Sequence, residues 1–181
     1  MLTPEKLVAL LDKPARLAHM ASAVRQEHLG PAIAIRATET PTTSPWPAPG
    51  DAAKRAELAV AVAPTPDARS AFATWLLELA AEGTAVRLAP CSTLAAGLHP
   101  LWCIAAARLV LPATARVEAR HDLLGIRLAQ VALGFGADTF SGPIEPDRKL
   151  PLAGITRPSE NSYAGIATLI RQAGLQPTES P

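Results

Sequence analysis

The side chains best suited to bind a ligand lie on segments that are predicted to form strands. In the segment 116–120, Arg-Val-Glu-Ala-Arg, charged and apolar side chains alternate. Because successive side chains of a strand point to opposite faces, the charged ones share a face. An arginine such as Arg120 can pair with a carboxylate or a phosphate. The same alternation in the other predicted strands gives six candidates for substrate binding: Arg87, Glu118, Arg120, Asp138, Thr139 and Ser141.

Each candidate has a purely structural alternative. Glu118 and its flanking arginines would also be satisfied as an ion-paired or solvated face with no ligand. Asp138 precedes Thr-Phe-Ser-Gly, a context as typical of a turn that bonds its own backbone as of a substrate contact at a strand end. The pair His121-Asp122 suggests acid–base chemistry, but Asp122 begins a predicted helix and helix capping explains it. His99, beside a proline at another helix start, is interpreted in the same way.

Several other chemistries have no motif in this sequence. Gly125, Gly134 and Gly136 fall within or at the end of a predicted helix, and their spacing fits no nucleotide-binding fingerprint. No serine stands in a nucleophile elbow, and there is no His-x-x-x-His or Cys-x-x-Cys pair, so neither a hydrolase nor a metal site is predicted. Cys91 and Cys103 lie in apolar segments and are expected to be reduced, buried thiols.

The elements that must position the candidates alternate regularly from Arg55 onward. The predicted strands are 58–63, 85–89, 116–120 and 137–141, and the helices between them are 67–81, 100–111 and 122–135. Parallel strands are joined by helical crossovers, so this order predicts an α/β fold with a parallel four-stranded sheet. A final amphipathic helix is predicted for residues 162–173. Ligands bind at the carboxyl ends of such strands, here near Cys91, Arg120 and residues 138–142.

The first part of the chain is predicted to stand apart from this sheet. Residues 1–37 form a helical segment, broken near Pro14, with a possible short strand at 33–36. Residues 38–54 are a proline-rich linker, in which Trp46 could dock on the body as an anchor. The predicted organisation is therefore 1–37 helical, 38–54 linker, 55–175 (β/α)4 unit and 176–181 tail.

Composition excludes some classes of partner. The 181 residues are 49% hydrophobic, which is enough to form one core. The net charge of +1 creates no field that would attract nucleic acid or an anionic membrane. The first residues do not resemble a signal peptide, and no apolar run reaches the roughly 18 to 20 residues of a membrane helix. A soluble, cytoplasmic protein without nucleic-acid or membrane partners is expected.

Three consecutive segments carry a resemblance to one enzyme family. They are 104–112 (Ile-Ala-Ala-Ala-Arg-Leu-Val-Leu-Pro), 122–138 (Asp-Leu-Leu-Gly-Ile-Arg-Leu-Ala-Gln-Val-Ala-Leu-Gly-Phe-Gly-Ala-Asp) and 166–177 (Ile-Ala-Thr-Leu-Ile-Arg-Gln-Ala-Gly-Leu-Gln-Pro). They resemble the last helices, the last strand and the exit of the radical-SAM barrel in aminofutalosine synthase and dehypoxanthinyl futalosine cyclase. The resemblance implies a half-barrel, the C-terminal half of a TIM-type barrel, preceded by N-terminal helices.

The motif that defines the chemistry of that family is missing. Its members hold a [4Fe–4S] cluster on a CxxxCxxC loop, and this chain has two cysteines, twelve residues apart. No cluster and no bound S-adenosylmethionine are therefore expected, and autonomous radical chemistry is not predicted. The proline-rich residues 38–50 stand about where the cluster-bearing half of the barrel would be, which implies that this half was lost.

The resemblance implies an accessory protein or pseudoenzyme of the futalosine route to menaquinone, which binds a pathway metabolite or a partner enzyme. Two alternatives stay open: a non-radical enzyme that uses the polar face, and a purely structural interaction module. Whether the protein is an enzyme is undecided. Because a four-stranded sheet leaves two open edges, a homodimer or a complex with a full-length pathway enzyme is expected.

Overall fold

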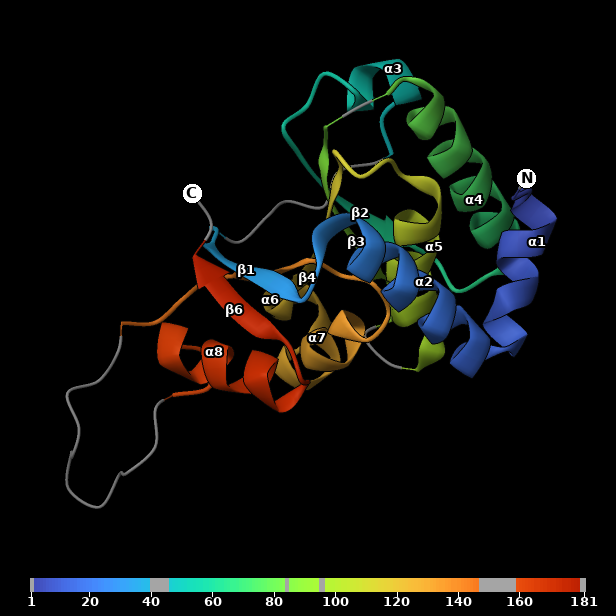
Figure 1. Ribbon diagram of the computed structural model, residues 1–181. Coiled ribbons are helices and arrows are strands. Elements are labelled where there is room, and N and C mark those ends of the chain that lie inside the picture. Colours follow the sequence, from blue (N-terminus) through green and yellow to red (C-terminus); the bar gives the residue numbers. More distant parts are fainter. Residues whose placement is uncertain (1, 40–45, 84, 95–96, 147–158, 180–181) are drawn as a thin grey trace, which may run out of the picture.

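The computed structural model describes residues 2–39, 46–83, 85–94, 97–146 and 159–179, which fold around a single sheet (Figure 1). Within this part of the chain the sheet has six strands, all parallel, in the order β2-β3-β4-β5-β1-β6. The strands are β1 Ala32–Ala37, β2 Glu57–Val62, β3 Arg87–Ser92, β4 Arg116–Arg120, β5 Thr139–Gly142 and β6 Gln176–Glu179. The helices are α1 Pro4–Ala9, α2 Pro14–Leu29, α3 Pro49–Ala52, α4 Pro66–Ala81, α5 Leu98–Val110, α6 His121–Leu124, α7 Ile126–Leu133 and α8 Tyr163–Gln172, with a 3₁₀ turn at Leu10–Asp12.

The predicted α/β class and parallel sheet are confirmed, but the predicted number of strands is wrong. β1 pairs with β5 on one side and with β6 on the other, and Ala34 is the register partner of both Thr139 and Thr178. The sequence Gln-Pro-Thr-Glu of β6 lacks the apolar alternation of a strand, so the sequence pattern predicts a tail at residues 176–181. Residues 176–179 have a weak intrinsic preference for a strand, but pairing with β1 outweighs it, because strand formation depends strongly on tertiary context.

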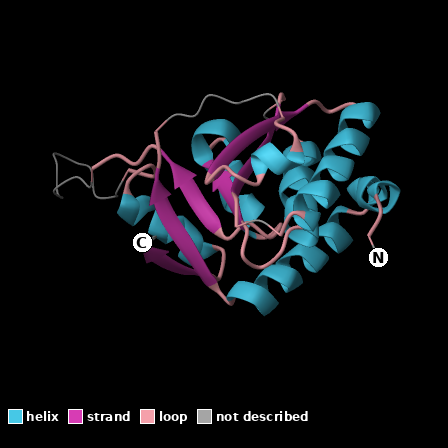
Figure 2. Ribbon diagram, turned by 90° about the horizontal axis from the view of Figure 1, so that it is seen from above, coloured by secondary structure: helices cyan, strands magenta, loops and turns pink. Residues whose placement is uncertain are grey.

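One face of the sheet is apolar and is covered by helices. Its buried side chains are Ile33, Ile35, Leu58, Val60, Val62, Leu88, Val117, Ala119 and Phe140. α4 packs on β2, α5 on β3 and β4, α7 on β4 and β5, and α8 on β1 and β6, while α2 packs against α5 (Figure 1). Figure 2 shows the strands fanned by the twist of the sheet with the long helices alongside. Burial of each large apolar side chain contributes about 1.5–3 kcal/mol, so this layer supplies the core.

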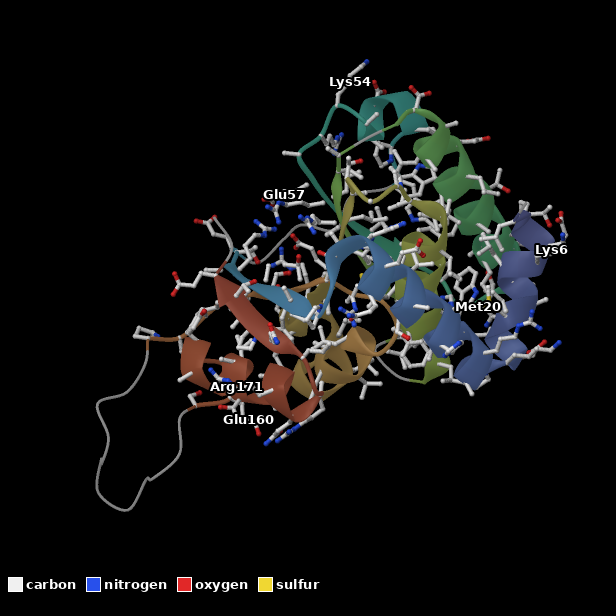
Figure 3. The ribbon with its side chains drawn as sticks, in the orientation of Figure 1. Lys6, Met20, Lys54, Glu57, Glu160 and Arg171 are labelled. Carbon is white, nitrogen blue, oxygen red and sulfur yellow. The ribbon has the colours of Figure 1, made fainter. Side chains whose placement is uncertain are left out.

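The opposite, polar face of the sheet is concave. Arg36 on β1 contacts Glu57 on β2 at 2.6 Å, although three strands lie between β1 and β2 in the sheet. In a flat sheet four strand spacings would place the two backbones about 19 Å apart, well beyond the combined reach of the side chains. The sheet must therefore be rolled toward its polar face. Glu57 is labelled in Figure 3, where nitrogen- and oxygen-tipped side chains gather beside β1.

The helix predicted for residues 122–135 is interrupted. Gly125 separates α6 from α7 with a φ of 81°, a conformation that glycine adopts without strain. The chain therefore makes one short turn, α6, directly at the carboxyl end of β4 before it starts the longer helix α7. This turn holds His121 and Asp122 at the end of the strand instead of carrying them away along a helix.

Trp46, the only described aromatic residue of the predicted linker, docks on the body, which is one of the two outcomes open for it from the sequence. Its Nε1 donates to the carbonyl of Ala61 at 2.9 Å, and its ring lies 5.4 Å from Phe72 and 6.3 Å from Trp75, centroid to centroid. The carbonyl of Ala56 accepts from Arg87 of β3, and that of Val62 accepts from Thr93 just after β3. The carbonyl of Ala61 therefore points outward, and Trp46 covers part of the β2 edge. Linker residues 40–45 lie outside the described residues.

None of the described helices is long and apolar enough to cross a membrane.

Candidate functional site

Glu118 is the centre of a polar network on the concave face. Its carboxylate, 2% exposed, accepts a bidentate pair of hydrogen bonds from Nε and Nη2 of Arg36, both at 3.0 Å, and one from Oγ of Ser141 at 2.8 Å. Arg87 lies farther away, with Nη1 3.8 Å from Oε1. The structure thus brings together three of the predicted site residues, since Ser141 bonds Glu118 and Arg87 lies within ion-pair distance of it. It adds Arg36, which was not a candidate because β1 was not expected to join the sheet.

Arg120 is held by protein groups at the carboxyl end of β4. Its Nε and Nη2 bind the two carboxylate oxygens of Asp122 at 3.0 and 2.9 Å, and Nη2 also donates to the carbonyl of Glu39 at 2.7 Å. The capping role expected for Asp122 is therefore wrong: α6 has no side-chain cap, and Asp122 bonds a strand residue instead. Arg120 therefore ties the turn α6 to the segment after β1 through its Nε and Nη2.

Asp138 lies on the other face of the sheet, at the amino end of β5. Its carboxylate forms a buried ion pair with Arg108 of α5 and accepts from the backbone N–H of Val117 at 2.8 Å and from Oγ1 of Thr139 at 2.7 Å. Burial raises the pKa of Asp138, while the charge of Arg108 acts in the opposite direction. The expected position at a strand carboxyl end is wrong, and so is the expected local turn, because the side chain bonds other elements.

A cavity of about 650 Å³ lies at the carboxyl ends of β4 and β5. Its lining residues are His121, Asp122, Ile126, Pro143, Ile144, Glu145, Pro146 and Asn161. Carboxyl ends of parallel strands are where α/β proteins bind ligands. The polar groups around the cavity are an imidazole, two carboxylates and an amide, a set that can orient a small polar molecule.

His121 is the most unusual residue of this cavity. Its ring stacks on Phe140 with centroids 5.8 Å apart and hydrogen-bonds the backbone of Pro143. Nε2 is buried and has no hydrogen-bond partner among the described residues. Burial lowers the pKa of His121, so the ring is neutral at neutral pH. Gly142 lies so close that a Cβ there would be 2.5 Å from Cδ2 and Nε2 of the ring.

The lowered pKa of His121 predicts a pH-dependent stability. A histidine that is harder to protonate when folded binds more protons when unfolded, so the folded state loses stability as the pH falls below the unfolded value of about 6.5. We expect the free energy of unfolding of the wild type to fall between pH 7 and pH 5. Relative to a His121→Gln variant, the slope attributable to this group is at most about 1.4 kcal/mol per pH unit.

Chemical denaturation at several pH values measures this difference. His99 also has a pKa lowered by burial, so the variant should flatten only part of the profile. His19, which is exposed on α2, provides the control: His19→Gln should leave the profile unchanged. Equal profiles for the wild type and the His121→Gln variant would show that His121 is as easily protonated in the folded as in the unfolded protein.

The remaining predicted residues and the thiols have local roles. Thr139 is fully buried and donates to Asp138, and Arg87 is 29% exposed at the amino end of β3. Burial raises the pKa of Cys91 to about 11, and its Sγ contacts the carbonyl of Val60 at 3.4 Å. Cys91 and Cys103 are both buried and free, and two such thiols do not fit a [4Fe–4S] cluster, which needs at least three thiolates from this type of loop.

Comparison with known proteins assigns no family. No family model matches the sequence, and no curated protein matches it. The fold and the cavity therefore define the protein only as a parallel α/β protein with a polar concave face and a cavity at the carboxyl ends of its strands.

Proposed function

We propose that this protein binds a small polar metabolite in the cavity at the carboxyl ends of β4 and β5. The observation that carries the proposal is His121. A buried imidazole nitrogen without a partner costs about 1–3 kcal/mol, and here it belongs to a residue that lines a 650 Å³ cavity in the usual ligand position of the fold. A ligand that orders this cavity and hydrogen-bonds the histidine would offset that cost.

We further propose that the metabolite belongs to the futalosine route to menaquinone. The support is the resemblance of residues 122–138 to the end of the radical-SAM barrel, together with the place of this stretch in the fold. Asp122 and Ile126 from this stretch line the cavity, and the rolled sheet is compatible with a half-barrel. The protein would then act as an accessory protein or pseudoenzyme, without radical chemistry of its own.

A partner enzyme or a second copy of this chain is part of the same proposal. β6 is a short edge strand with exposed residues, and exposed edges can recruit a further strand. The β2 edge is less accessible, because Trp46 bonds its carbonyl at Ala61. The β6 edge is therefore the side on which a homodimer or a complex with a full-length pathway enzyme would form.

One observation favours a second function, a non-radical enzyme. The neutral imidazole of His121 lies beside two carboxylates, Asp122 and Glu145, in one cavity. A histidine that is neutral at pH 7 can accept a proton from a bound substrate. In that case a reaction rate, and not only binding, would depend on His121.

A thermal-shift screen tests the proposed function. The compounds are S-adenosylmethionine, futalosine-type nucleosides and chorismate-derived acids, since a bound ligand raises the melting temperature by mass action. We expect a futalosine-type nucleoside or chorismate-derived acid to raise the melting temperature of the wild type, and S-adenosylmethionine to leave it unchanged. Loss of one hydrogen bond to the ligand in His121→Gln should weaken binding about tenfold.

The control is His19→Gln, which should bind as the wild type does. No shift with any compound class, or equal shifts for the wild type and the His121→Gln variant, would contradict a ligand at this cavity. Product formation from a bound compound, lost in the His121→Gln variant, would favour the enzyme over the accessory protein.

A further inference from the structure

We propose that a second cavity, at the amino ends of the strands, binds the phosphate group of a small molecule. This cavity of about 250 Å³ lies at the opposite end of the sheet from the one that contains His121. Its lining residues are Leu29, Ala32, Ala34, Arg87, Arg116, Asp138, Thr139, Thr178 and Glu179. At about 30 Å³ per water molecule it has room for about eight waters, or for a phosphate group and part of its parent molecule.

Two guanidinium groups converge on this cavity from neighbouring strands. Arg87 of β3 and Arg116 of β4 are register partners, so their backbones lie about 4.8 Å apart and their side chains leave the same face of the sheet. Like charges placed directly opposite each other on paired strands are destabilising. A shared anion between the two groups would convert this repulsion into attraction.

The protein itself compensates these charges only in part. The backbone N–H of Arg116 donates to Val86 at 2.9 Å, but its guanidinium group forms no hydrogen bond or ion pair with the described residues. The contact of Arg87 with Glu118 is 3.8 Å, at the limit of an ion pair. Glu118 is already bonded by Arg36 and Ser141. Both cavity arginines therefore keep donors available for a ligand.

Two more arginines add positive potential at this end of the sheet. Arg25 and Arg108 both act on Asp138, which bonds Arg108 directly. Nε of Arg25 and Nη1 of Arg108 are buried without a hydrogen-bond partner among the described residues. Two arginines, Arg87 and Arg116, and two acidic residues, Asp138 and the exposed Glu179, line the cavity. The carboxylate of Asp138 is already paired with Arg108, so Glu179 is the acidic lining residue left to oppose the two arginines.

A phosphate fits these observations better than a carboxylate does. Its second ionisation is nearly complete at neutral pH, so it brings close to two negative charges, which matches two guanidinium groups. Each arginine can form a fork of two parallel hydrogen bonds to phosphate oxygens. A carboxylate has one charge and two oxygens, which one arginine satisfies.

Titration of inorganic phosphate into the full chain, followed by phosphorus-31 line broadening and by melting temperature, tests the site. Sodium chloride at matched ionic strength separates specific binding from screening. We expect phosphate at low millimolar concentration to broaden its resonance and to raise the melting temperature, and acetate to have a much smaller effect. Arg116→Gln should weaken phosphate binding at least tenfold, because a charge-assisted hydrogen bond is lost.

Arg171→Gln is the matched control, since Arg171 is exposed on α8 and lies far from Glu57 and the concave face (Figure 3). It removes the same charge and should leave phosphate binding unchanged.

Without phosphate, the Arg116→Gln variant should melt at or slightly above the wild-type temperature, because repulsion by Arg87 is removed. If Arg116→Gln is poorly folded, Arg87→Gln takes its place. No broadening with the wild type, or equal binding by the variants and the control, would overturn the site. A dominant response to acetate would overturn the assignment to phosphate.

Discussion

Replacing Arg108 with methionine is expected to lower the free energy of unfolding by about 3–5 kcal/mol, because it leaves a buried carboxylate without its counterion. Arg108 is fully buried in α5, pairs with Asp138, and donates from Nε to the carbonyl of Gly136 at 3.0 Å. Such a loss is a large part of the 5–15 kcal/mol that stabilises a typical domain. Urea denaturation monitored by tryptophan fluorescence measures it.

The loss caused by Arg108→Met should also depend on pH. Burial already raises the pKa of Asp138 against the opposing charge of Arg108, and loss of this arginine raises the pKa further. The folded state then binds a proton that the unfolded state releases, and stability falls as the pH rises above the unfolded value. The variant should therefore be less destabilised at pH 5 than at pH 8.

The exposed pair Arg127–Glu160, with side chains 64% and 49% exposed, is the control for Arg108→Met. Arg127→Gln should change stability by less than about 1 kcal/mol. The double variant Arg108→Met/Asp138→Leu removes both charges and should be more stable than the two single losses added together predict. Losses below 1 kcal/mol for Arg108→Met would show that the pair does not hold α5 on the sheet.

Gly142→Ala is expected to abolish ligand binding at the cavity of His121 and to cost about 1–3 kcal/mol of stability. Its Cβ would lie 2.5 Å from Cδ2 and Nε2 of the imidazole, so the ring must leave its position on Phe140. The backbone at Gly142, with a φ of 143°, is itself unfavourable for alanine. Thermal shift with the compound that binds the wild type, and urea denaturation, give the two readouts.

Gly174→Ala separates the effect of the clash from that of the backbone. Gly174 has a φ of 75°, but nothing lies within 4 Å of an added Cβ. This variant should lose stability through backbone strain alone and should bind the ligand normally. If Gly142→Ala binds as tightly as Gly174→Ala, the position of His121 is not what makes the cavity competent.

The regular part of the fold could be predicted from sequence because local and global signals agree there. β4 occupies Arg116–Arg120, the predicted range, since charged and apolar side chains alternate along it and define its two faces. β1 and β6 could not be assigned to the sheet in advance, because their neighbours are distant in sequence and the four residues of β6 have no apolar pattern. The single helix predicted from residue 122 missed the break at Gly125, where one residue with positive φ changes the path of the chain.

The candidate site was predictable only in the part that follows strand alternation. The alternation of side chains along a strand correctly places Ser141 and Asp138 on opposite faces of the sheet. Ser141 bonds Glu118 on the polar face, whereas Asp138 pairs with Arg108 of α5 on the other face. The alternation contains no information about which residues of other elements meet these groups, so Arg36 and Arg108 were not anticipated. The sequence pairs His121 only with its neighbour Asp122. Its environment is made by Phe140, Gly142 and Pro143, which are separated from it in sequence by α6 and α7.

The place of β1 between β5 and β6 has a consequence for the order of folding. Ala34 must find Thr139 and Thr178, which lie at the far side of the sequence, so the central ladder closes a very long loop. Closing such loops is entropically costly, and proteins dominated by distant contacts fold slowly. During synthesis β1 cannot pair with β5 and β6 until the residues up to Glu179 have been made. An unpaired apolar strand in a partly made chain is prone to aggregate.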